Sequence, residues 1–97
     1  MAGSRHDLCR EATVQSELGI HARPAARISK IAMTSASAVW LARGEERVDA
    51  TSIIDILSLG CGKGARLTVA VEDPADRPVL EAIVDLIENE SAVNGNG

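Results

Sequence analysis

Two hydrophobic periods follow each other near the end of this 97-residue chain, and they limit its possible folds. Over residues 65–72 the apolar residues Leu67, Val69 and Val71 alternate with less apolar ones, which is the pattern of a β-strand with one buried face. Over residues 80–90 apolar residues recur at helical spacing with carboxylates between them, which predicts a helix. A strand and a helix that each bury one face have to pack against each other. The chain therefore needs a sheet with at least one helix on its apolar face.

Weaker patterns in the first two thirds of the chain complete a mixed order of strands and helices. They predict a strand over residues 8–15, a helix from about residue 21 to residue 33, a hairpin with strands at 37–42 and 47–50, and a short helix after Ser52 that ends before the glycines of 60–64. One sheet with helices on one face and its other face open satisfies this order. We predict a single domain over residues 8–90, with a flexible leader at 1–7 and a flexible tail at 91–97.

Composition excludes several classes of protein. Hydrophobic residues make up 45% of the chain and charged residues 25%, which are usual values for a soluble globular protein. The net charge is -4 and Trp40 is the one aromatic residue, so we expect no nucleic-acid binding. The longest uncharged run, residues 31–42, is too short and too polar for a membrane helix, and residues 1–10 lack the apolar core of a signal peptide. We therefore expect a cytoplasmic protein without a membrane-inserted segment.

The two cysteines and the tryptophan are assigned no chemical role. Cys9 and Cys61 are far apart in the sequence and have no metal-ligand spacing, so we expect free thiols in a reducing compartment, no metal and no cofactor. Trp40 is out of phase with Val39 and Leu41 and should therefore point to the open face of the sheet. There it is either a binding surface or homodimer contact, or simply a partly covered surface residue.

His21 is the residue whose position has the clearest chemical meaning. It lies where the turn at Gly19 meets the predicted helix, next to first-turn N–H groups that have no partner inside the helix. These N–H groups and the positive end of the helix dipole favour an anion. A phosphoryl group on the imidazole would be stabilised by the N–H groups of Ala22 and Arg23 and by the Arg23 guanidinium. Spacing alone leaves the alternative that His21 is an exposed capping residue and Arg23 a surface charge.

Two segments of the chain resemble motifs of one protein family. Residues 19–26, Gly-Ile-His-Ala-Arg-Pro-Ala-Ala, closely resemble the active-site signature of HPr, the histidine-containing phosphocarrier family of the bacterial phosphoenolpyruvate-dependent phosphotransferase system. Residues 52–60, Ser-Ile-Ile-Asp-Ile-Leu-Ser-Leu-Gly, look like the regulatory-serine segment of that family, and the resemblance covers about residues 9–90. It implies an α+β open-faced two-layer sandwich of the order βαββαβα, in which three helices cover one face of a four-stranded antiparallel sheet.

The resemblance also implies a role for each residue of the first motif. His21 would carry the phosphoryl group on the ring nitrogen nearer the backbone. Arg23 would neutralise the phosphoryl oxygens, beside the backbone N–H groups of Ala22 and Arg23, and Pro24 would fix the first turn of the helix. In the family, Enzyme I transfers a phosphoryl group from phosphoenolpyruvate to this histidine, and an EIIA-type domain takes it away. The resemblance thus implies a carrier in sugar transport and not an enzyme. We expect a monomer, because such a carrier docks with several partners in turn.

The second motif supplies a candidate regulatory site and a candidate docking surface. Ser52 aligns with the serine that HPr kinase/phosphorylase modifies in some members, and it is also placed to cap a helix in a capping box with Asp55. A phosphate on Ser52 would place negative charge near the histidine and so block transfer. Asp55 departs from the neutral or basic residue expected in sugar-transport members, which leaves this switch open. Ile53 and Ile54, ahead of Leu57, are predicted to contact partners, although at least one of the three should be buried.

Two alternatives to the sugar-transport carrier remain. Within the family, the chain could be a nitrogen-related or regulatory homologue that controls other proteins through its phosphorylation state. From another class, it could be a small two-layer module that binds a ligand or a protein without phosphoryl transfer. The intact motif at residues 21–24 weighs against that module, because binding alone does not need a histidine nucleophile beside an arginine at a helix start.

Overall fold

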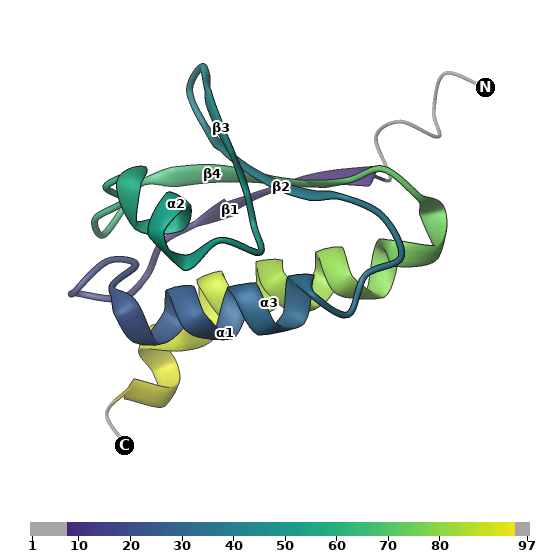
Figure 1. Cartoon of the computed structure of the whole chain (residues 1–97). Coiled ribbons are helices and arrows are strands. Elements are labelled where there is room, and N and C mark those ends of the chain that lie inside the picture. The colour runs from purple at the N-terminus through teal and green to yellow at the C-terminus, as the bar shows by residue number, and fades with distance from the viewer. Residues whose placement is uncertain (1–7, 95–97) are drawn as a thin grey trace.

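The computed structural model describes residues 8–94, in which a four-stranded antiparallel sheet is covered on one face by three α-helices (Figure 1). In chain order the elements are β1 (Cys9–Thr13), α1 (Ala22–Ala32), β2 (Val39–Arg43), β3 (Glu46–Asp49), α2 (Ile53–Ser58), β4 (Arg66–Val71), a 3₁₀ turn η2 (Pro74–Asp76) and α3 (Arg77–Asn94). This order confirms the predicted α+β open-faced sandwich. The predicted leader, residues 1–7, and residues 95–97 of the predicted tail lie outside the described residues.

The last helix is longer than the sequence pattern predicts. α3 continues to Asn94, so the tail predicted to start at residue 91 begins inside the helix. The apolar period ends earlier, but the first strong helix breaker after it is Gly95, and the residues between the two are compatible with a helix. Among residues 8–94, no helix is both long enough and apolar enough to cross a membrane.

The order of strands in the sheet is β1-β4-β2-β3, so the first and last strands of the chain pair with each other. Thr13 lies opposite Arg66 in this antiparallel pair, and just beyond it the Val14 N–H donates to the carbonyl oxygen of Ala65 at 2.9 Å. Because antiparallel partners run in opposite directions, the segment after β1 lies beside the segment before β4. The turn that leads into α1 therefore has residues 60–65 as a long-range neighbour.

The core lies between the sheet and the two long helices. β4 buries Leu67, Val69 and Val71, as its alternation predicts, and leaves Thr68 and Ala70 half-buried on the open face. The helices contribute buried aliphatic residues at helical spacing: Ala25, Ile28 and Ala32 from α1, and Leu80, Ile83, Val84 and Ile87 from α3. Burial of these apolar surfaces against the sheet is the main force that fixes the two helices in place.

Trp40 lies on the open face of the sheet, as predicted. Val39 and Leu41 on either side of it are buried, whereas Trp40 is half-buried. Its ring Nε1–H donates to Glu72 Oε2 at 2.9 Å, and the guanidinium carbon of Arg47 lies 4.1 Å from the ring centroid, which is a cation–π contact. These contacts occupy part of the indole ring, and they favour the interpretation of Trp40 as a partly covered surface residue.

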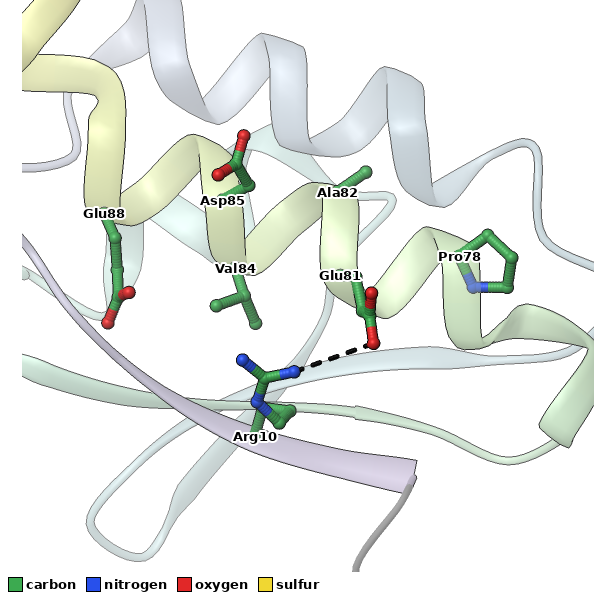
Figure 2. A pocket seen from close by; sticks show the side chains of 7 residues that line it. All are labelled: Arg10, Pro78, Glu81, Ala82, Val84, Asp85 and Glu88. Atoms are coloured by element: carbon green, nitrogen blue, oxygen red, sulfur yellow. Dashed lines mark ion pairs between the residues drawn. The ribbon is translucent and has the colours of Figure 1, made fainter.

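α3 runs over β1, and side chains of the two elements face each other (Figure 2). Arg10 extends from β1 toward this helix, where its Nη1 lies 3.7 Å from Glu81 Oε2. Further along the helix, Glu88 Oε2 accepts a hydrogen bond from the Thr13 N–H at 3.2 Å. These side chains and Val84 line an open hollow of about 560 Å³. Charged residues at an edge strand hinder pairing with a strand of another molecule, so we interpret this edge as protected.

Candidate functional site

His21 is the N-cap residue of α1. Its backbone is extended, with φ -94° and ψ -168°, and its carbonyl oxygen accepts a hydrogen bond from the Ala25 N–H at 3.1 Å. The side chain makes no capping hydrogen bond, so the imidazole leaves the first-turn N–H groups of the helix available. His21 is half-buried, and Ala22 and Arg23 beside it are exposed. The ring therefore lies at the surface, directly at the start of the helix.

The N-terminal end of α1 has no negative charge of its own. Its first turn contains no acidic residue, and Pro24 in that turn is buried and has no N–H group. The N–H groups of Ala22 and Arg23 have no acceptor within the helix. A phosphoryl group on the His21 ring would thus meet backbone donors and the Arg23 guanidinium without a competing carboxylate in that turn.

The turn before His21 packs tightly against the segment between α2 and β4. Gly19 has φ +69°, and a Cβ atom there would lie 2.4 Å from the Cys61 carbonyl oxygen and 2.8 Å from Gly62 Cα. Both the backbone conformation and the lack of space therefore require glycine. The Ile20 N–H donates to the same Cys61 oxygen at 2.9 Å. The sequence identifies Gly19 as a turn residue but has no local signal for this contact, because the partner lies far along the chain.

Ser52 caps α2 as predicted, but the capping box predicted with Asp55 is incomplete. Ser52 Oγ accepts a hydrogen bond from the Asp55 N–H at 3.2 Å. The reciprocal bond does not form, because the Ser52 N–H donates instead to the Asp49 carbonyl oxygen at 3.1 Å. The backbone N–H and the hydroxyl of Thr51 donate to Asp49 Oδ1, and these bonds lower the pKa of that carboxyl group. The Asp55 carboxylate is left exposed.

The apolar residues predicted to contact partners are exposed on α2. Ile54 is 78% exposed, and Ile53 and Leu57 are 39% exposed each. The expectation that one of these three is buried is wrong, because α2 has only six residues and turns Ile56 into the core instead. Leu59, just after the helix, is the next buried position. Ile53 and Leu57 do not differ in exposure, so burial gives no reason to prefer one of them.

A residue that the sequence analysis missed extends this apolar surface onto α1. Met33, the C-cap residue of α1, is 66% exposed and lines a shallow hollow of about 330 Å³ together with Ile53. Arg27 and Lys30 of α1 line the same hollow. The name α1–α2 surface is used below for the exposed apolar side chains Met33, Ile53, Ile54 and Leu57. Nothing local in the sequence separates Met33 from a buried position at the end of the helix.

The two thiols are free and lie in different environments. Cys9 is exposed on β1, and Cys61 is buried in the segment between α2 and β4. Burial raises the pKa of the Cys61 thiol, and the positive charge of Arg43 partly opposes this effect. In the part of the chain that the structure describes, no group of three or more His, Cys, Asp and Glu side chains is arranged to hold a metal ion.

Comparison with known proteins relates this fold and site to one family. Residues 8–89 match the family described as PTS HPr component phosphorylation site. Phosphocarrier protein HPr of Cupriavidus necator is 33% identical over 82 residues, which are 84% of this chain and 92% of that protein. The solved structure of HPr-C-His from Thermoanaerobacter tengcongensis has a TM-score of 0.76 and 32% identity over 87% of this chain and 94% of that one. A structure described as an HPr dimer from the same organism has a TM-score of 0.61 and 34% identity over 80% of this chain and 90% of that one.

An open-faced sandwich that matches phosphocarrier proteins over nearly all of its described length is itself of the phosphocarrier class. The chain belongs to the HPr family of the phosphotransferase system. This result confirms the family resemblance that the two sequence motifs predict. It supports a carrier role in which the protein is not itself a catalyst.

Proposed function

We propose that this chain accepts a phosphoryl group on His21 from phosphorylated Enzyme I and passes it to an EIIA-type domain. The main support is the position of His21 at the N-terminus of α1, whose first turn has no acidic residue. The phosphoryl group would come originally from phosphoenolpyruvate and serve sugar transport. The protein would be a substrate of Enzyme I that returns to its free form only when the acceptor removes the group.

The proposed transfer forms one bond and breaks one bond. A lone pair of His21 Nδ1, the ring nitrogen nearer the backbone, attacks phosphorus, and the bond from phosphorus to the donor atom of Enzyme I breaks with its electron pair left on the donor. The backbone N–H groups of Ala22 and Arg23 and the Arg23 guanidinium meet the charge on the phosphoryl oxygens. Pro24 restricts the backbone of the first turn and so keeps these donors in place. An exposed helix end leaves the group accessible to the next acceptor.

The α1–α2 surface is proposed as part of the docking site for both partners. Ile53 and Ile54 place apolar side chains in solvent, where a partner can cover them. Arg27 and Lys30 line the hollow at the same surface. A partner that offers apolar side chains bordered by carboxylates would complement this combination of apolar and basic groups.

Ser52 is proposed as a regulatory phosphorylation site for an HPr kinase/phosphorylase. Its Oγ is bonded to the Asp55 N–H, and a phosphate there would add negative charge to a helix that already carries the Asp55 carboxylate. Incubation with ATP and a serine-specific HPr kinase should give an acid-stable phosphate on the wild type and on Ser58→Ala, a control from the same helix. Ser52→Ala should incorporate none. Absence of label on the wild type would exclude this switch for that kinase.

A regulatory homologue is the second candidate function. The observation that favours it is Asp55, which is exposed in the first turn of α2, where a sugar-transport member is expected to have a neutral or basic residue. Such a protein would use the same chemistry at His21 but would control other proteins through its phosphorylation state. In either case we propose a cytoplasmic monomer, although a similar HPr is described as a dimer.

Phosphorus NMR tests the site directly. The wild type is incubated with phosphoenolpyruvate, Mg²⁺ and purified Enzyme I, alongside His21→Ala and His6→Ala. The chain contains two histidines, so His6→Ala is the matched control. An acid-labile phosphohistidine signal is expected in the wild type and in His6→Ala, and none in His21→Ala. A signal that persists in His21→Ala would exclude His21 as the site, and no signal in the wild type with several Enzyme I proteins would favour a binding module.

A further inference from the structure

Arg43 joins the end of β2 to the end of α2. It is the last residue of its strand, and its Nη1 group donates to the carbonyl oxygens of Leu59 at 3.0 Å and Gly60 at 2.8 Å. Leu59 is the C-cap residue of α2, so the guanidinium lies at the negative end of that helix, where carbonyl groups lack helical partners. Hydrogen bonds with a charged donor are stronger than those between neutral groups.

Cys61, the residue after Leu59 and Gly60, holds the turn before His21. The Cys61 carbonyl oxygen accepts the Ile20 N–H at 2.9 Å, and the glycine before Ile20 packs too closely on the same oxygen for a Cβ atom to fit. Ile20 is directly followed by His21 in the chain. A short path of contacts therefore runs from Arg43 through residues 59–61 to the histidine.

The segment that Arg43 contacts is rich in glycine. Residues 60, 62 and 64 are all glycine, whose backbone has access to many conformations. An ion pair between Lys63 Nζ and Glu17 Oε2, at 2.6 Å, also links this segment to the turn before α1. Its side chains are 54% and 79% exposed, and ion pairs in water contribute little to stability. The Gly64 N–H also ties the far end of the segment to the residue after β1, where it donates to the Val14 carbonyl oxygen at 2.8 Å, and the two bonds from Arg43 hold the near end, directly before Cys61.

We infer that Arg43 is a positioning residue for phosphoryl acceptance at His21. It acts through other residues: by fixing the carbonyl groups of Leu59 and Gly60 it fixes the Cys61 oxygen, which in turn orders the turn that orients the imidazole. Neither motif that resembles the HPr family includes Arg43. The inference rests on the proposed function of His21. Phosphohistidine formation by the wild type tests the proposed function, and the Arg43 variants test the inference.

The first measurement compares Arg43→Gln and Arg43→Lys with Arg47→Gln, a matched control on the same hairpin. Both glutamine variants remove one positive charge, but Arg47 contacts Trp40 on the open face and not α2. Amide hydrogen exchange is followed at Ile20 and, as a measure of global opening, at Val69 of β4. In Arg43→Gln, exchange at Ile20 relative to Val69 should become about tenfold faster, the effect of losing charge-assisted hydrogen bonds. Arg43→Lys and Arg47→Gln should stay close to the wild type.

The second measurement is the rate of phosphohistidine formation with Enzyme I and phosphoenolpyruvate. Arg43→Gln should lower kcat about tenfold through misplacement of the imidazole, with little change in the KM for this chain because the α1–α2 surface is intact. Arg43→Lys should restore most of the rate. Unchanged exchange at Ile20 in Arg43→Gln would overturn the inference, and so would faster exchange with a normal kcat. If the wild type forms no phosphohistidine, the proposed function fails and the inference fails with it.

Discussion

Replacement of Gly19 by alanine is expected to weaken both the fold and the candidate site. Gly19 has φ +69°, and the new Cβ would lie 2.4 Å from the Cys61 carbonyl oxygen, well inside van der Waals contact. Gly44→Ala is the matched control, because Gly44 has a similar φ of +61° with no atom within 4 Å of the added Cβ. The two variants share the backbone strain and differ in the close contact.

The expected losses of unfolding free energy follow from the backbone strain and the close contact. A left-handed conformation costs alanine about 1 to 2 kcal/mol, and this is the whole effect in Gly44→Ala. In Gly19→Ala the segment at residues 60–62 must also move away. That movement breaks the bond from the Ile20 N–H to the Cys61 oxygen, worth about 1 kcal/mol, and adds about 1 to 3 kcal/mol of overpacking. We therefore expect Gly19→Ala to lose about 3 to 6 kcal/mol of unfolding free energy.

Urea unfolding followed by the fluorescence of Trp40 measures this difference, since Trp40 is the one tryptophan in the chain. The urea midpoint of Gly19→Ala should lie at least about 1 M below that of Gly44→Ala. Phosphohistidine formation should be retained in Gly44→Ala and reduced in Gly19→Ala. Equal losses of stability in the two variants would refute the reasoning, because they would show that residues 60–62 yield to the new methyl group at no cost.

Three further predictions concern the buried side chains of Asp76 and Cys61. Asp76 is 3% exposed and its carboxylate oxygens accept the N–H groups of Ala36 and Ser37 at 2.8 and 2.9 Å, so Asp76→Ala should lower the free energy of unfolding by about 3 kcal/mol. A loss below about 1 kcal/mol in urea would contradict this. A thiol reagent should modify Cys9 quickly and Cys61 slowly, since burial raises the pKa of the Cys61 thiol above its usual 9.0, and equal rates would show that the site opens freely. Because the pKa of Cys61 is higher in the folded than in the unfolded state, its contribution to the free energy of unfolding is fully present below pH 9.0 and is lost as the pH rises further. Cys61→Ala should therefore lose less stability at alkaline pH than the wild type.

Several features of the fold can be predicted from short stretches of sequence. The alternation of Leu67, Val69 and Val71 predicts the buried face of β4, and the phase of Trp40 predicts its place on the open face. His21 at the start of α1 follows from the neighbouring turn and the helical period after it. These predictions succeed because the direction of a side chain within one strand or one helical turn depends on residues close by.

The predictions for α2 show where local patterns fail. A helix of six residues presents about one side chain to the core, and the sequence does not say which one. The structure buries Ile56 and leaves Ile53 and Leu57 exposed. The choice depends on how α2 packs against the rest of the core, where Ile56 and Leu59 lie among buried side chains from other elements.

The sequence by itself determined the order of the elements, the buried face of the clearest strand and the place of His21 at a helix start, because each depends on contacts between residues near one another in the chain. The tertiary structure decided that Gly19 and Arg43 both meet residues 59–62. The Gly19 contact depends on the antiparallel pairing of β1 with β4, and the Arg43 contact on the antiparallel pairing of β2 with β4, which brings the end of β2 beside the start of β4. Loops of different length could close between the same strands at similar entropic cost, so packing of the whole core selects these pairings.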